Sequence, residues 1–421
     1  MNKLIFLRLS TILFSCVVLH ACIKDSCKQR YTYSWFEPIY KTSQEVRSNI
    51  KSSPAQDIRQ PGKMVLLGNY IFLNELNKGI HIIDNTNPSL PENIAFIDIP
   101  GNVDLAIKGN TLYADLYTDL VILDISNPLN VVRKKIVSGV FPQRYYGDAN
   151  LAPDSGEIIY DWKKHDTTIM QSCSDLHGIF PMATYYASAS TSVQSGSSIS
   201  NPIGITGSMS RFSIVNDYLY TVDDENLNVF NISIPDNPAF TNKTQVDYHV
   251  ETIYPFKDKL FIGSNNGVFI YNVNSSRGIP VQAGQFTHAR ACDPVIADDN
   301  YAYITLHSGT PCLGYNNELD IVKLNNLTDA GLAKVYNLTS PQGLSKDGNL
   351  LFICDGTDGL KVYNAADIQN LQLIKQFKDI ETYDVIAWNK IAIVVAADGL
   401  YEFSYANPNS IQLLGKIDIR N

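Results

Sequence analysis

The sequence predicts an all-β fold: a seven-bladed β-propeller of four-stranded antiparallel blades, with an irregular insertion between blades two and three. Three observations lead to this prediction. Short segments rich in Val, Ile, Leu and Tyr alternate with turns of Gly, Asn and Pro. These segments come in groups of four, and the groups recur at a period of about 40 residues. Seven such groups fill most of the 421-residue chain.

Residues 104–137 show one complete repeat. Four strands are expected in it, at 104–108, 111–116, 120–125 and 131–137. Gly109-Asn110 and Asn127-Pro128 mark two of the turns. β-Branched and aromatic residues favour the strands, whereas Gly, Asn and Pro favour the turns between them. The unit is therefore a four-stranded antiparallel meander, and one such sheet cannot bury both of its faces alone.

The third strand of the repeat is the easiest to follow along the chain. Its seven copies begin at Ile80, Leu120, Leu227, Val268, Leu319, Leu360 and Leu400. The spacings are 40, 107, 41, 51, 41 and 40 residues, so the two long gaps contain one period plus an insertion. Radially arranged sheets bury both faces against their neighbours, whereas an open solenoid would need polar capping repeats, and none is evident. We therefore expect a closed propeller over residues 61–421.

The turn that follows the third strand suggests a family. Ile82-Ile-Asp-Asn-Thr-Asn-Pro88 and Val121-Ile-Leu-Asp-Ile-Ser-Asn-Pro128 are similar to the LVIVD repeat of bacterial surface propellers, in which an apolar strand ends in Asp and an Asn-Pro turn follows. The resemblance covers roughly residues 61–421. It implies the fold and a place in the cell envelope, as in lipoproteins of the Bacteroidetes type, but no common activity. The Asn-Pro turn itself is explained by turn chemistry.

The N-terminus has the pattern of a bacterial lipoprotein. Residues 1–21 combine an early Lys, an apolar stretch and a small residue before Cys22, as in a secretory signal peptide. Leu19-His20-Ala21-Cys22 resembles a lipobox, in which the chain is cut before the cysteine and the thiol receives a lipid; an ordinary secreted cysteine is the alternative. We expect residues 22–60 to be a lipidated tether and N-terminal segment. The protein would then be an outer-membrane lipoprotein, facing either the periplasm or the cell surface.

Composition and motifs limit the chemistry. The formal net charge is −9, and loss of Lys3 and Arg8 with the signal peptide would make it −11 (−9 − 2). An acidic protein is a poor partner for nucleic acid. The sequence has no G-x-S-x-G, H-E-x-x-H or P-loop, so we assign no catalytic residue, metal ligand or cofactor. The acidic turns at 223–225 and 355–358 could hold calcium, although we favour ordinary turn chemistry for both.

Two segments depart from the repeat, and function on a regular scaffold usually lies in such segments. The larger is the insertion at 138–210, whose aromatic residues could stack on a sugar, pack on a partner or cover the propeller itself. The smaller comprises 288–293, between blades four and five, and the loop at 307–317. Connections between blades emerge on the same face as loops from the second to the third strand, and this face is the candidate ligand site. Its candidate residues are Trp162, Tyr185, Tyr186, His288, Arg290, His307 and Tyr315.

Five cysteines follow the lipobox. Cys292 and Cys312 are predicted to lie on the same face, so we expect a disulfide between them; its loop of about 20 residues would contribute around 3 kcal/mol. Cys354, at the end of a second strand, is expected to be a buried free thiol. Cys27 and Cys173 could pair only if the insertion folds back to the tether.

Three classes of function are compatible with these features. The first, which we expect, is a non-catalytic recognition module that is held to the membrane by its lipid and binds an envelope protein or a glycan. The second is a structural component of the envelope, and the third is a hydrolase or lyase with its site on the elaborated face. A central group of carboxylates with His288 or His307 would favour an enzyme, whereas an exposed aromatic surface would favour recognition.

Overall fold

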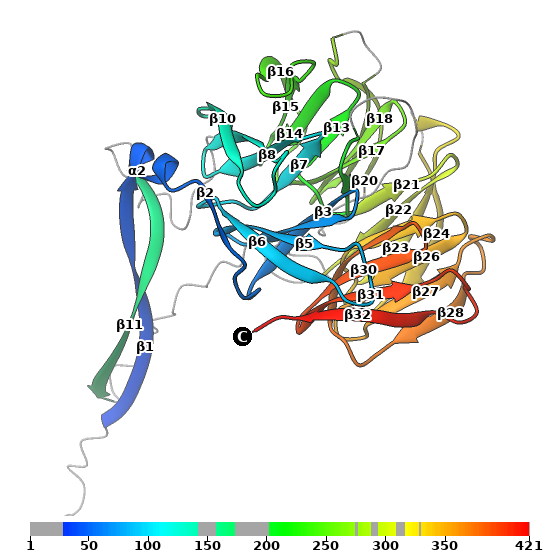
Figure 1. Cartoon of the computed structure of the whole chain (residues 1–421). Helices are drawn as coiled ribbons and strands as arrows, with labels where there is room; N and C mark the ends of the chain where they lie inside the picture. The colour runs from blue at the N-terminus through cyan, green and yellow to red at the C-terminus, as the bar shows by residue number, and fades with distance from the viewer. Residues whose placement is uncertain are drawn as a thin grey trace, which may run out of the picture. The chain divides into compact units, whose positions relative to one another are not determined.

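The computed structural model describes residues 28–141, 157–172, 202–273, 277–287, 294–308, 316–327 and 330–420. They include seven antiparallel blades arranged in a ring, which confirms the predicted seven-bladed β-propeller (Figure 1). A short helix, α2 (Ser43–Ser48), begins at a capping box formed by Thr42 and Glu45. No helix in the described part of the chain is long and apolar enough to cross a membrane. The chain divides into two compact units, the propeller and a smaller unit that contains most of β1 and β11.

The first three blades are meanders in which consecutive strands are hydrogen-bonded neighbours. Blade 1 contains β3 (Pro61–Leu67), β4 (Tyr70–Glu75), β5 (Gly79–Asp84) and β6 (Glu92–Asp98). Blade 2 contains β7 (Leu105–Lys108), β8 (Thr111–Leu116), β9 (Asp119–Asp124) and β10 (Val132–Val137). Blade 3 contains β13 (Phe212–Val215), β14 (Tyr218–Val222), β15 (Asn226–Asn231) and β16 (Ala239–Gln245). In blade 2, every strand begins and ends within one residue of the position predicted from the sequence.

The other four blades repeat this order. Blade 4 contains β17 (Val250–Phe256), β18 (Lys259–Ser264), β19 (Gly267–Asn272) and β20 (Val281–Thr287). Blade 5 contains β21 (Val295–Ala297), β22 (Tyr301–Leu306), β23 (Glu318–Lys323) and β24 (Leu332–Asn337). Blade 6 contains β25 (Leu344–Asp347), β26 (Leu350–Cys354), β27 (Leu360–Asn364) and β28 (Gln372–Phe377). Blade 7 contains β29 (Thr382–Trp388), β30 (Ile391–Ala396), β31 (Gly399–Ser404) and β32 (Gln412–Asp418).

Blade 1 is larger than the other blades because two further strands join it. β2 (Lys51–Pro54) pairs with the outer strand β6, and β12 (Ile205–Thr206) pairs with the inner strand β3. The sheet therefore has six strands, in the order β12-β3-β4-β5-β6-β2. The N-terminal segment and the end of the insertion both contribute backbone to the first blade.

The seams between blades are apolar, with hydrogen bonds at their margins. At the closing seam, Met64 and Leu73 of blade 1 pack in one cluster with Ile386 and Val395 of blade 7. Elsewhere a buried tyrosine of one blade bonds the turn between the third and fourth strands of the next. The Tyr113 hydroxyl of blade 2, for example, donates to the carbonyl oxygen of Pro235 in blade 3 at 2.8 Å. These turns thus help to join neighbouring blades.

A separate two-stranded ribbon is formed by β1 (Lys28–Thr42) and β11 (Glu157–Ser172). Thr32 is bonded to Thr168 through their hydroxyls at 3.1 Å, and the Ser34 hydroxyl donates to Asp166 at 2.5 Å. As the residue number rises along β1, the number of its bonded partner in β11 falls, so the two strands are antiparallel. The sequence did not predict this pairing. It shows that the insertion has strands of its own and folds back to the tether.

Candidate functional site

The last part of the insertion, residues 202–211, runs along the innermost strands of the propeller. β12 lies in this segment and pairs with β3 of blade 1. The backbone N–H of Gly204 donates to the carbonyl oxygen of Ile107, in β7 of blade 2, at 2.8 Å. A Cβ atom on Gly204 would overlap the side chain of Val65, so this close approach requires glycine.

The same segment then contacts blades on other parts of the ring. The Ser208 hydroxyl oxygen accepts a hydrogen bond from the backbone N–H of Leu344, in blade 6, at 2.6 Å. The carbonyl oxygen of Ser210 accepts one from the N–H of Ile253, in blade 4, at 2.7 Å. Both serines are buried. Because the segment bonds blades 1, 2, 4 and 6, it lies at the centre of the ring.

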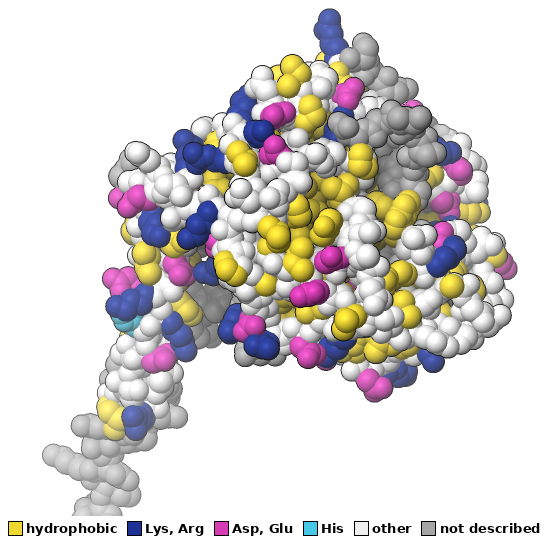
Figure 2. Space-filling model, viewed as in Figure 1, with side chains coloured by type: hydrophobic (Ala, Val, Ile, Leu, Met, Phe, Trp, Pro, Cys, Tyr) yellow, Lys and Arg dark blue, Asp and Glu magenta, His cyan; other side chains and the backbone are white. Residues whose placement is uncertain are grey.

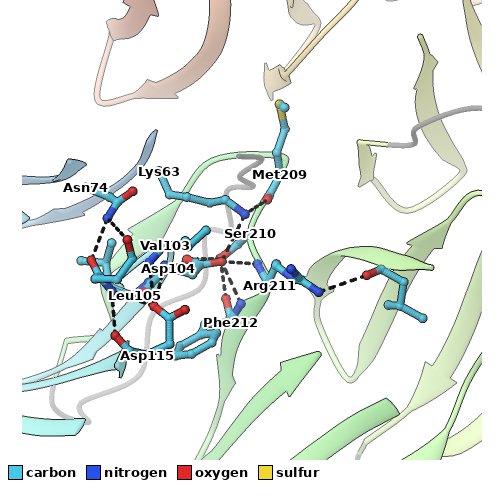
Figure 3. A network of polar contacts seen from close by, with 12 residues as sticks. Lys63, Asn74, Val103, Asp104, Leu105, Asp115, Met209, Ser210, Arg211 and Phe212 are labelled. Carbon is cyan, nitrogen blue, oxygen red and sulfur yellow. Dashed lines mark hydrogen bonds and ion pairs between the residues drawn. The ribbon is translucent and has the colours of Figure 1, made fainter. Parts of the chain in front are cut away.

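A buried polar cluster surrounds this segment (Figure 3). The Lys63 ammonium lies 3.5 Å from a carboxylate oxygen of Asp104 and donates to the carbonyl oxygen of Met209 at 3.1 Å. The backbone N–H of Arg211 also donates to Asp104. Burial lowers the pKa of Lys63 to about 8, while attraction to Asp104 and Asp384 opposes this shift. The central charges are therefore paired with one another inside the protein.

Asp115 fixes the backbone that carries Asp104. Its Oδ1 accepts hydrogen bonds from the side-chain amide of Asn102 at 2.7 Å and from the backbone N–H groups of Val103 and Asp104 at 2.8 and 2.9 Å. The Asn74 side-chain amide in turn donates to the Asn102 side-chain oxygen, also at 2.7 Å. The central acids thus hold the connection between blades 1 and 2, and their oxygens are engaged by groups of the protein itself.

The structure describes only two of the seven candidate ligand-face residues. His307 follows β22; burial lowers its pKa, and its Nδ1 has no hydrogen-bond partner within the described ranges. Its Nε2 lies 3.5 Å from the Gln342 side-chain nitrogen. Trp162 lies on β11, in the ribbon. The other candidates lie outside the described residues: Tyr185, Tyr186, His288, Arg290 and Tyr315. So do all cysteines except Cys354: Cys16, Cys22, Cys27, Cys173, Cys292 and Cys312.

The ribbon carries four exposed aromatic side chains on one strand. Tyr33, Trp35, Phe36 and Tyr40 all lie on β1 and are between 38% and 45% exposed. Trp35 stacks on His165 with ring centroids 4.3 Å apart. In the sequence, the only sign of this surface was the run of aromatic residues in the tether. No nearby residue indicated that this run pairs with β11.

The two acidic turns differ in their contacts. Asp223 accepts hydrogen bonds from the backbone N–H groups of Glu225 and Asn226 in its own turn, at 2.9 and 2.8 Å. Asp355 is bonded by the ammonium of Lys361 and by the backbone N–H groups of Thr339 and Ser340, which lie outside its turn. Across the described ranges, no group of three or more His, Cys, Asp or Glu side chains is arranged to hold a metal.

Cys354 is buried and free, which confirms the expectation for this residue. Burial raises the pKa of its thiol well above the ordinary value, and nearby Asp384 adds to the effect. A thiol in this state is a poor nucleophile. Cys354 is therefore part of the core and not a reactive group.

The seam between blades 7 and 1 contains a second unusual ionisable group. Glu402, on β31, is fully buried and accepts one hydrogen bond, from the side-chain amide of Asn85 at 3.0 Å. Its Oε1 and the Asn85 Oδ1 both lack a hydrogen-bond partner among the described residues. Burial raises the pKa of Glu402 to about 7, and the Asn85 bond opposes the shift.

Comparisons with known proteins agree with the propeller. The LVIVD repeat matches residues 60–95 and 101–138, which correspond to blades 1 and 2. No curated protein sequence matches the chain. A protein from Lactobacillus plantarum has a similar structure, with a TM-score of 0.51 and 11% identity over 85% of this chain and 96% of that one. The periplasmic gluconolactonase PpgL of Pseudomonas aeruginosa gives a TM-score of 0.51 and 13% identity, with the same coverage. Identities this low show a shared fold alone.

Proposed function

We propose that the chain is an exported, lipid-anchored recognition module of the cell envelope, and that the ribbon of β1 and β11 is its binding surface. The signal-like residues 1–21 and the lipobox ending at Cys22 support export and anchoring. The partner would be an envelope protein or a glycan.

The exposed aromatic ribbon carries the recognition part of this proposal. A two-stranded sheet is marginally stable alone, and a partner that packs against it would stabilise it. Tyr, Trp and Phe are enriched at protein interfaces because they supply a large contact area. On the visible side of the ribbon, hydrophobic side chains lie beside charged ones (Figure 2). Such a surface suits a partner that offers both apolar and polar groups.

The centre of the propeller gives less support to an enzyme. The carboxylates of Asp104 and Asp384 are at most 3% exposed, and Arg211 at the end of the 202–211 segment bonds Asp104. A substrate would have to displace this segment to reach Asp104. Likeness in fold to a gluconolactonase does not carry an activity to this chain.

The test compares two triple variants of the whole chain in an envelope pull-down and a glycan array. The first removes exposed aromatic groups of the ribbon (Tyr33→Ser, Trp35→Ser, Phe36→Ser). The matched control removes exposed apolar groups of the propeller: Leu90→Ser, Leu129→Ser and Leu413→Ser, whose parent residues are 75%, 58% and 52% exposed. We expect a partner or glycan that the parent and the control retain and the ribbon variant loses.

Two results would count against this function. If the parent chain retains neither a protein nor a glycan, a structural role becomes the better explanation. If both triple variants retain the partner equally, recognition does not use the ribbon.

A further inference from the structure

One position of the repeat has the same backbone contact in all seven blades. It is the residue directly after the third strand, and its backbone N–H donates to a carbonyl oxygen in the turn between the first and second strands. The seven residues are Asn85, Ile125, Ile232, Val273, Leu324, Ala365 and Tyr405. Blade 6 therefore has the smallest side chain of the set.

The effect of this side chain is visible by comparing two seams. Tyr405 of blade 7 reaches Phe352 of blade 6, with ring centroids 4.9 Å apart, and is fully buried. At the seam between blades 5 and 6, Ala365 takes the place of Tyr405, and Tyr303 takes the place of Phe352 on the second strand. The methyl group of Ala365 cannot fill the space that the Tyr405 ring fills.

A hollow of about 400 Å³ lies at this seam. Its lining residues come from the two blades and include Asp298, Tyr301, Tyr303, Lys323, Lys346, Asn349, Ala365, Asp367 and Gln369. The volume is in the lower part of the range of small-ligand sites, about 300–1,000 Å³. The hollow lies among the turns that join strands one and two or strands three and four, which is the face opposite to the elaborated loops.

Part of the wall is held in place by contacts that do not involve a ligand. Asp298 Oδ2 accepts a hydrogen bond from the Tyr303 hydroxyl at 3.0 Å and lies 2.9 Å from the Lys346 ammonium. The equivalent hydroxyl in blade 2 bonds the next blade instead, so the Tyr303 contact is particular to this seam. Burial alone would raise the pKa of Asp298, but hydrogen bonds from Asn300 and Lys346 lower it on balance, so Asp298 is ionised at neutral pH.

The charges and surfaces of the hollow indicate a neutral, hydroxyl-rich ligand. Two acids, Asp298 and Asp367, are balanced by two bases, Lys323 and Lys346, so the site has no net preference for an anion or a cation. The half-buried Tyr301 ring offers an apolar surface. The exposed Gln369 side chain donates from its amide nitrogen to the carbonyl oxygen of Ala333 at 3.3 Å, and its amide oxygen can accept a hydrogen bond from a ligand hydroxyl. A sugar ring has apolar C–H groups and hydroxyls in the same molecule.

We propose that the hollow between blades 5 and 6 binds one neutral sugar residue, either free or at the end of a glycan. This site goes beyond the recognition surface of the ribbon and does not depend on it. Hydroxyls of the sugar would bond the charged and amide side chains, and a C–H face would rest on Tyr301.

The test uses saturation-transfer NMR and calorimetry on the whole chain with neutral monosaccharides and their oligosaccharides. The blocking variant is Ala365→Tyr, which copies the residue of blade 7. The mild variant is Gln369→Ala, matched by Asn409→Ala at the same position of blade 7, where Tyr405 fills the seam; both parent side chains are exposed. We expect binding to be lost in Ala365→Tyr, weakened about 5- to 10-fold in Gln369→Ala and unchanged in Asn409→Ala, because a hydrogen bond contributes about 1 kcal/mol.

The outcomes separate the two proposals. Binding of oligosaccharides but not of free monosaccharides would identify the glycan terminus as the source. The proposal fails if no neutral sugar binds at millimolar concentration, or if Gln369→Ala binds sugar as tightly as the parent does. The Gln369→Ala result tests the proposal even if Ala365→Tyr does not fold. Sugar binding that is lost only in the ribbon triple variant would contradict this site and support the ribbon.

Discussion

We predict that Glu402 makes the stability of the ring dependent on pH. Each blade has one residue on its third strand directly beside a β-bulge, and six of the seven are aliphatic and buried: Ile82, Ile122, Val229, Ile270, Ile321 and Val362. Blade 7 has Glu402 at this position, equally buried. The carboxyl therefore stands in a core position at the seam where the ring closes.

The magnitude follows from the pKa. Glu402 has a pKa of about 7 in the folded protein, against 4.5 for an ordinary glutamate, because burial disfavours the charged form. The difference of about 2.5 units corresponds to about 3 kcal/mol, at 1.36 kcal/mol per unit. The folded state holds the proton more tightly than the unfolded state. The contribution of Glu402 to the stability of the folded state is therefore greatest below about pH 4.5. This contribution falls as the pH rises to about 7 and does not change above that pH.

The variant Glu402→Gln isolates this effect, because it keeps the size of the side chain and removes the titration. We expect the variant to gain up to about 3 kcal/mol on the parent between pH 4.5 and pH 8, in the free energy of unfolding measured with urea. Other titrating groups are common to both proteins and cancel in the difference. A difference that is the same at pH 5 and pH 8 would refute the reasoning and place the Glu402 pKa near its ordinary value.

Three further predictions concern the core and the cysteines. Lys63→Met should lower the free energy of unfolding in urea by about 3–5 kcal/mol, because it leaves Asp104 buried without its cation. The loss should be smaller in the double variant that also carries Asp104→Asn. Equal losses in the single and double variants would contradict the ion pair between Lys63 and Asp104. Cys354 should react with a thiol reagent only after unfolding, so rapid labelling of the native protein would show that it is accessible. β1 begins directly after Cys27 and β11 ends directly before Cys173, and in an antiparallel pair these two ends are neighbours. We therefore expect a disulfide between Cys27 and Cys173, seen in a non-reducing proteolytic digest as one disulfide-linked pair of peptides. Recovery of the two cysteines in separate peptides would exclude this disulfide.

Local patterns predicted the propeller because its strands pair with their neighbours in sequence. The ends of β7 to β10 followed from hydrophobic strands and turn residues that lie within about 35 residues of one another. The ribbon could not be found in this way, since Trp35 and His165 are separated by more than a hundred residues with no tight turn between them. Pairing between remote segments leaves little local signal.

The candidate sites were harder to predict than the fold. The central segment is rich in Ser and Gly, which resembles a surface loop, and its burial depends on partners in four different blades. Glu402 did leave a signal, because alignment of the seven third strands places a single Glu in a column of Ile and Val. Ala365 leaves a weaker signal in the sequence, because what matters is that its position has no large side chain.

The segment at 202–211 has a consequence for how the protein is made. It begins 65 residues after blade 2 (202 − 137), but its hydrogen bonds to Ile253 and Leu344 require chain that comes later. The first two blades therefore have an incompletely bonded segment beside them until a further 166 residues (377 − 211) are available and blade 6 is complete. Assembly of the ring is thus expected to be cooperative and late, and the folding chain should be most vulnerable to proteases before blade 6 is complete.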